Sequence, residues 1–244
     1  MKRTGRVLFW WLLLTPCFVF AQLDPVPRNL IQLGYYQPLE GYAPFAGYAF
    51  YYYNRPDFLR TNLTLRLAIA PVYLDSELGF VGALGPKTDL GVGIAGGGFS
   101  DNYYEIRDGT YYSDESFDGY GAGASLGIYH LFNPASRIPL NFVLRGGMHY
   151  SFYRDSDSTA PNFQLPDNHD TFAVRSGLRW GGVEPTLFPP LAMEMSVWYE
   201  GQFRTAWGPY GFNGDRQLNP QSQLFWAEAA MAYTLSKSQQ SRSS

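Results

Sequence analysis

The region from Thr171 to Leu235 alternates between apolar residues and polar or small residues, and this period of two most strongly limits the possible folds. Its first segment sets Phe172, Val174, Ser176, Leu178 and Trp180 against Ala173, Arg175, Gly177 and Arg179. Segments 193–204 and 225–235 alternate in the same way. Such a pattern over nine or more residues predicts extended strands with two chemically different faces. Because aromatic residues accompany the apolar set, we expect the apolar face to meet lipid and the charged face to line the lumen of a barrel.

The first 21 residues are predicted to be a secretory signal peptide. Lys2, Arg3 and Arg6 precede an apolar run from Val7 to Phe20, which ends at the small residue Ala21. This is the three-part layout of an export signal. The alternative is a membrane anchor, but the apolar core is shorter than the roughly 20 residues that a spanning helix needs. Cys17 is interpreted as part of this core, and not as a lipidation site.

Composition narrows the function classes for the mature chain. Without residues 1–21 the chain has no cysteine, so a disulfide framework and a cysteine-ligated metal are excluded. The leader takes three of the 18 basic residues and none of the 21 acidic ones, which leaves a net charge of about −6. This charge argues against a nucleic-acid partner. Only 16% of residues are charged, against roughly 25% in soluble domains.

The whole pattern predicts an all-β fold, an antiparallel up-and-down transmembrane β-barrel of about 10 strands, with 8–12 possible, over residues 22–235. A polar tail, 236–244, follows it. Compact turns are expected at 54–60, 85–89, 133–139 and 184–190, and a short connection at 71–76. Long loops rich in Asp, Asn and Tyr are expected at 100–119, 155–170 and 206–223. This asymmetry is typical of outer-membrane barrels, whose periplasmic turns are short and whose extracellular loops are long.

Inward-facing charges form the best-defined candidate site. The predicted lumen network consists of Arg66, Arg145, His149, Arg175, Arg179, Glu194, Glu200 and Glu228. A barrel of this size has an interior just filled by side chains, so enclosed charges must pair. We therefore expect a salt-bridged plug. The alternative reading is a narrow polar conduit or a site for a small anionic ligand.

His149 and Ser151 form a pair on one strand face that resembles the His-x-Ser pair of outer-membrane lipid A deacylases. In that family the pair faces lipid, whereas here the alternation directs it into the lumen, and Phe152 replaces the asparagine that follows the serine. Asp155 and Asp157 are candidates to orient the histidine. We expect no catalytic site here. No metal site is expected either, and we interpret the acidic residues of loop 100–119 as a solvated cluster, not as a calcium site.

Aromatic residues near the strand ends are predicted to mark the membrane interfaces. The lipid-facing candidates are Tyr51, Tyr53, Trp180, Tyr199 and Tyr233. Trp198 and Trp226 fall on the other face and are expected to point into the lumen.

With these features together, the chain resembles small bacterial outer-membrane β-barrels of the OmpA/OmpX type. The most specific part is the last strand, where Met231, Tyr233 and Leu235 are similar to the terminal insertion signal of that class, although Leu235 replaces the final aromatic residue and a polar tail follows. The resemblance implies export to the bacterial outer membrane and no cofactor. It also implies as partners outer-membrane lipid, the barrel assembly machinery and a possible extracellular ligand of the long loops.

The resemblance does not fix one activity, because this fold serves many roles. We expect a non-enzymatic protein with a structural or surface-interaction role. The alternatives are a narrow channel for small polar solutes, a lipid-modifying enzyme that uses His149, and a soluble secreted ligand-binding barrel with an apolar lumen.

Overall fold

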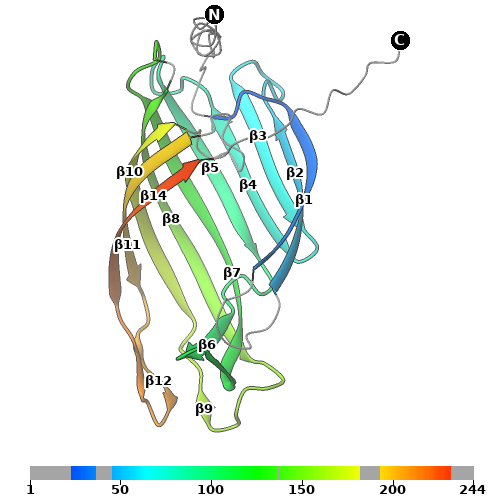
Figure 1. The fold of residues 1–244 in the computed structure, drawn as a ribbon, viewed down its shortest axis with the longest axis vertical. Coiled ribbons are helices and arrows are strands. Elements are labelled where there is room, and N and C mark those ends of the chain that lie inside the picture. Colours follow the sequence, from blue (N-terminus) through cyan, green and yellow to red (C-terminus); the bar gives the residue numbers. More distant parts are fainter. Residues whose placement is uncertain (1–22, 37–45, 137, 182–192, 232–244) are drawn as a thin grey trace, which may run out of the picture.

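The computed structural model describes residues 23–36, 46–136, 138–181 and 193–231, and these residues form strands and their connections (Figure 1). The described part of the chain holds no helix long and apolar enough to cross a membrane. Several predicted features lie outside the described residues: the signal peptide 1–21, the turn 184–190, Tyr233 and the tail 236–244.

One large antiparallel sheet contains most of the strands, in the order β1-β2-β3-β4-β5-β7-β8-β10-β11-β14. Their bounds are β1 Arg28–Tyr36, β2 Ala46–Arg55, β3 Leu63–Ala70, β4 Tyr73–Phe80, β5 Thr88–Gly97, β7 Thr110–Leu131, β8 Leu140–Asp155, β10 His169–Gly181, β11 Met193–Arg204 and β14 Gln221–Met231. Each strand pairs with the next one along this path, which confirms the predicted all-β, antiparallel, up-and-down order and agrees with the expected number of about ten.

The two ends of the sheet differ in their connections. Turns 56–62, 81–87 and 132–139 lie at one end, drawn at the top of Figure 1 and called the proximal end here. The opposite, distal end carries the long loops, as predicted. One connection is shorter than expected, because Ala70 already pairs with Tyr73 and leaves only Pro71 and Val72 as the turn.

The predicted long loops are more ordered than their composition suggested. They contain β6 (Tyr103–Arg107), β9 (Phe163–Gln164), β12 (Gly208–Phe212) and β13 (Arg216–Leu218), and β7 begins within the first of them. Asp108 and Gly109 both have positive φ, 48° and 73°, between Arg107 and Thr110, which pair. Two such residues between paired strands make the tight hairpin turn for which an Asp-Gly dipeptide is suited. Strands β9, β12 and β13 form a second, three-stranded sheet at the distal end.

The large sheet buries its polar face and exposes its apolar face. Buried polar residues on it include Thr64, Arg66, Glu77, Asp89, Asn141, Arg179, Glu194 and Ser196. Exposed apolar residues on the other face include Val92, Ile94, Leu126, Met148, Val174, Leu178, Met195 and Val197. We call the two faces inner and outer. Their chemistry is the reverse of that expected for a soluble ligand-binding barrel.

The predicted interface aromatics in the described part lie on the outer face. Tyr51 and Tyr53 stack with ring centroids 6.4 Å apart, and Tyr199 packs against Phe225 at 4.9 Å. Trp180 is exposed. Trp198, by contrast, is buried on the inner face and stacks on Trp226 at 5.7 Å, as its place in the alternation predicted.

The sheet has two edge strands, β1 and β14. The ladders between described residues join each of them to one neighbour, β2 and β11, and not to one another. Among the described residues the sheet is therefore open between β1 and β14.

Candidate functional site

The centre of the inner face holds three side chains that bond one another, and we call Glu77, Tyr129 and Arg145 the inner network. Arg145 Nη2 donates to Glu77 Oε2 and contacts the Tyr129 hydroxyl, both at 2.7 Å, and this hydroxyl also donates to Glu77 at 2.9 Å. Glu77 and Tyr129 are 3% and 0% exposed. The carboxylate is therefore deeply buried, and it is compensated by one guanidinium and one hydroxyl.

Glycines on the same face make room for this network. A Cβ on Gly91 would lie 2.9 Å from the Glu77 carboxyl, and a Cβ on Gly127 would lie 2.6 Å from the Tyr129 hydroxyl. Both distances are shorter than side chains tolerate. The glycine-rich stretches of β5 and β7 thus allow large polar side chains from neighbouring strands to cross the inner face.

Further ion pairs lie on both sides of the inner network. Arg66 bonds both carboxylate oxygens of Asp75, at 3.0 and 3.2 Å, in the two-bond geometry that a guanidinium favours. Arg179 Nε lies 2.8 Å from Glu194 Oε1, and both side chains are buried. These two ion pairs compensate the charges of three predicted network residues, Arg66, Arg179 and Glu194.

Arg175 lies over aromatic rings. Its guanidinium carbon is 4.0 Å from the centroid of Trp198 and 5.1 Å from that of Trp226. Gly177 allows this stack, since a Cβ there would lie 2.4 Å from Trp198. A guanidinium over a desolvated tryptophan gains cation–π attraction in addition to any ion pairing.

The predicted network residues are only partly brought together. Glu200 is half-buried and accepts a hydrogen bond from Gln202 at 3.0 Å, and Glu228 is exposed on the edge strand β14, opposite Ser196. The main acidic partners, Asp75 and Glu77, were not among the predicted residues. The alternation along β4 predicts that both side chains point inward. Because residues 71–76 were expected to form a connection, the first part of this strand was not recognised.

His149 belongs to a separate polar group near the distal end. Its Nε2 lies 2.8 Å from Asp101 Oδ2, and Ser151 hydrogen-bonds the same carboxylate. Burial alone would raise the pKa of Asp101, but the hydrogen bonds from His149 and Ser151 outweigh it and lower that pKa. A Cβ on Gly121 would lie 2.2 Å from His149 Nε2 and 2.3 Å from the carboxylate, so this contact needs a glycine.

This group differs from a nucleophilic triad. In a triad the histidine bonds the serine with one nitrogen and the acid with the other. Here Asp101 bonds both His149 and Ser151, so the carboxylate stands between the base and the hydroxyl. The residue that orients His149 is Asp101, and the candidates named from sequence, Asp155 and Asp157, lie at the end of β8 and beyond it.

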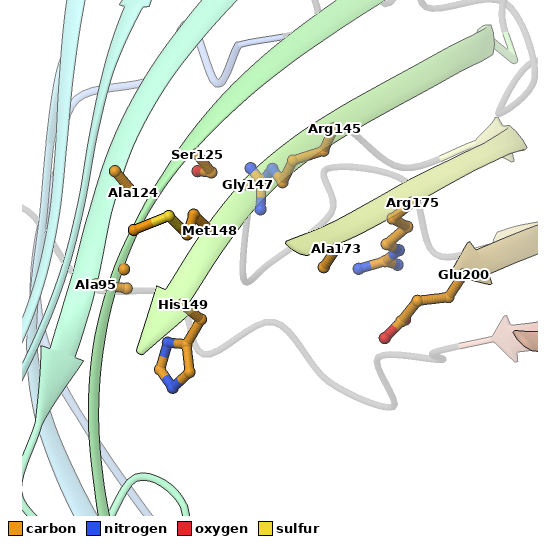
Figure 2. A pocket seen from close by; sticks show the side chains of 11 residues that line it. Ala95, Ala124, Ser125, Arg145, Gly147, Met148, His149, Ala173, Arg175 and Glu200 are labelled. Atoms are coloured by element: carbon orange, nitrogen blue, oxygen red, sulfur yellow. The ribbon is translucent and has the colours of Figure 1, made fainter. Parts of the chain in front are cut away.

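A cavity of about 310 Å³ lies between these groups on the inner face. Arg145, Arg175, His149, Glu200 and Ser125 line it together with Met148, glycines and alanines (Figure 2). Its polar groups carry both signs of charge, and the alanines and Met148 add apolar surface.

The ordered long loops meet in a second charged group, which we call the distal cluster: Glu105, Arg107, Glu115 and Arg216. Arg216 pairs with Glu105 at 3.3 Å and also with Glu115, and Arg107 pairs with Glu105 at 3.4 Å and also with Glu115. Phe163 packs beside the cluster, 5.1 Å from the Arg216 guanidinium. Two arginines and two glutamates therefore tie the β6–β7 hairpin to the β11–β14 loop.

The acidic residues of loop 100–119 were expected to be solvated, but Glu115 is buried. Glu115 is held by arginines and Asp101 by His149. In the described ranges no group of three or more His, Cys, Asp or Glu side chains has the arrangement of a metal site.

Comparisons with protein-family models, with curated proteins and with solved structures found no match to this chain.

Proposed function

We propose that this chain is a small outer-membrane β-barrel of the OmpA/OmpX type, with a largely closed lumen and a structural or surface-interaction role. The observation that carries the proposal is the inverted chemistry of the sheet, which buries charge and exposes aliphatic and aromatic side chains. Soluble monomers rarely expose contiguous apolar patches of more than a few hundred Å². Lipid around the outer face removes this cost, and an outer apolar band around a polar interior is the pattern of transmembrane barrels.

The proposal requires β1 and β14 to pair, and the register of the sheet supports such a closure. Residues paired across successive strands lead from Arg28 in β1 to Ser222 in β14. Arg28 stands at the proximal start of β1, whereas Ser222 stands at the distal start of β14. From β1 to β14 the pairing therefore shifts along the strand direction by about one strand length. A closed barrel with tilted strands needs a stagger of this kind.

The size of this stagger selects the closing partners. Ten strands tilted by about 35–45°, spaced about 4.8 Å apart with a rise of about 3.3 Å per residue, need a stagger of about 10–14 residues. An even stagger keeps inner side chains on the inner face. A stagger of about 12 residues places Ala229 opposite Leu33, and about 10 places it opposite Ile31. Leu33, Ile31 and Ala229 are all exposed in the open sheet.

Disulfide cross-linking tests the closure cleanly, because the predicted mature chain has no cysteine. We expect Leu33→Cys with Ala229→Cys, or the neighbouring choice Ile31→Cys with Ala229→Cys, to form an intramolecular bond on oxidation in outer membranes. The matched control is Leu33→Cys with Glu228→Cys, which places the second thiol on the opposite face. The native protein should also run faster on gels before boiling than after. Soluble protein without this shift, and without the cross-link, would overturn the proposal.

In this proposal the distal end faces outward and the short proximal turns face the periplasm. The distal cluster then makes the long loops a fixed platform on the cell surface, which suits contact with an extracellular ligand better than mobile loops would. The proposal assigns the chain no catalytic role, since the Asp101 carboxylate separates His149 from Ser151. Its partners are outer-membrane lipid and the barrel assembly machinery.

A narrow channel for small polar solutes is the second candidate, and the charged groups that line the cavity favour it. A continuous path would need the residues proximal to the inner network to move. Single-channel conductance in planar bilayers separates the two candidates. A closed barrel gives no current steps, whereas a channel gives small current steps whose size rises with salt concentration.

A further inference from the structure

The segment before β1 lies within the proximal part of the inner face, although it belongs to no strand. Leu23 and Asp24 are 3% and 4% exposed, which places them among the most buried residues described. Pro25 and Pro27 follow them, and proline has no N–H with which to join a ladder. The segment is therefore held by side-chain packing and a few hydrogen bonds, and not by the sheet.

Leu23 is the apolar anchor of this segment. It forms the one cluster of buried hydrophobic residues found among the described positions, with Tyr129, Val143 and Trp198. Gly79 provides its seat, because a Cβ on Gly79 would lie 2.3 Å from a Leu23 methyl carbon. This cluster forms an apolar socket within a face that also carries many polar residues, and Leu23 fills it.

Hydrogen bonds fix the segment around this anchor. The Leu23 N–H donates to Asp89 Oδ2 at 3.4 Å, and the Asn54 amide donates to the carbonyls of Asp24 and Val26 at 2.9 and 2.8 Å. Asn54 is itself 2% exposed. Arg28, at the start of β1, pairs with Asp24. The contacts come from β1, β2 and β5, so the segment spans several strands on the inner face.

We propose that Leu23–Val26 is a removable plug that closes the proximal end of the lumen. It shares a buried cluster with Tyr129 of the inner network, and in this proposal it separates the 310 Å³ cavity from the proximal side. With the predicted cleavage after Ala21, Leu23 is the second residue of the mature chain, so the plug withdraws without breaking any strand ladder. Withdrawal opens a polar path for small hydrated ions. The inference rests on the proposed barrel.

Conductance of reconstituted full-length protein tests the plug. Leu23→Asp puts a charge into the apolar socket, and we expect it to raise the open fraction about tenfold or more over the wild type. Val26→Asp is the matched control, since Val26 lies in the same segment but is 45% exposed, and its conductance should stay at the wild-type level. If Leu23→Asp keeps the gel shift but conducts no more than the wild type, the plug proposal is overturned. If the wild-type protein itself shows no gel shift, the barrel proposal is overturned instead.

A labelling experiment keeps the test valid if Leu23→Asp does not fold. In an otherwise cysteine-free mature chain, a water-soluble maleimide should react much more slowly with Leu23→Cys than with Val26→Cys. Unfolding in detergent and heat should make the two rates equal. Equal, fast rates in the folded barrel would show that Leu23 is not seated, and would overturn the proposal.

Discussion

The inner network and the distal cluster are both built from arginine and glutamate, but they are held in different ways. The inner network joins side chains of β4, β7 and β8, and each of these strands is fixed by the ladder of one sheet. The distal cluster joins Glu115, near the start of β7, to Arg216 of β13, which are 101 residues apart in the chain. The first group depends on strand register, and the second depends on how loops pack.

This difference has energetic consequences. Glu77 is 3% exposed, so its charge must be compensated within the sheet. Glu115 in the distal cluster is 9% exposed, but Arg107, which it shares with Glu105, is 47% exposed. Solvent therefore screens part of the distal cluster. We expect changes in the inner network to affect the whole barrel and changes in the distal cluster to affect only the loops.

The largest effect is expected for Arg145→Ala. This change leaves the Glu77 carboxylate buried without its guanidinium, and breaking a buried pair from one side costs on the order of 3 kcal/mol. Urea unfolding of the reconstituted protein, followed by gel mobility, measures the loss. The double variant Glu77→Gln with Arg145→Ala carries no uncompensated charge and should recover part of the stability that Arg145→Ala loses. A double variant as unstable as the single one would show that lost packing, and not charge, is responsible.

A smaller and local effect is expected for Arg216→Ala. Glu105 and Glu115 then share only Arg107, and the loss should be on the order of 2 kcal/mol, confined to the loops. Hydrogen exchange should rise in residues 208–218 and stay unchanged in β8 and in the part of β7 that pairs with β5. Arg55→Ala, which removes an exposed arginine at the proximal end, is the control. If Arg216→Ala lowered the urea midpoint of the whole barrel, the contrast between the two groups would fail.

The same contrast explains how much could be predicted from the sequence. The strand order, the two faces and the inward direction of Arg145, Arg179 and Trp198 follow from period-two alternation, because a strand side chain has only two directions. The partners Glu77 and Asp75 could have been found by extending this alternation through β4. The contacts of Arg216 could not, since loop residues have no fixed period. The local signals in these loops were the dipeptides Asp108-Gly109 and Asn213-Gly214, in which both residues have positive φ.

Asp101 links a loop to a strand, because its carboxylate lies in loop 98–102 and bonds His149 of β8. Its pKa lies below the ordinary value of 3.8, so its contribution to loop docking is present above that pH and is lost as pH falls through the lower, folded-state value. The expected effect is therefore a loosening of loop 98–102 on going from pH 5 to pH 3.

Backbone amides beside Asp101 report this loosening directly. The Asp101 N–H donates to the Gly119 carbonyl, and the Gly119 N–H donates to Asn102 Oδ1. Hydrogen-exchange protection of these two amides, corrected for intrinsic exchange, should fall at the lower pH, by less than in Arg216→Ala. In Asp101→Asn the protection should be lower at pH 5 and should no longer change with pH. Protection in the unaltered protein that stays constant from pH 5 to pH 3 would mean that the strand ladder and loop packing hold this segment without the carboxylate. Loop position would then depend less on single charges than the distal cluster implies.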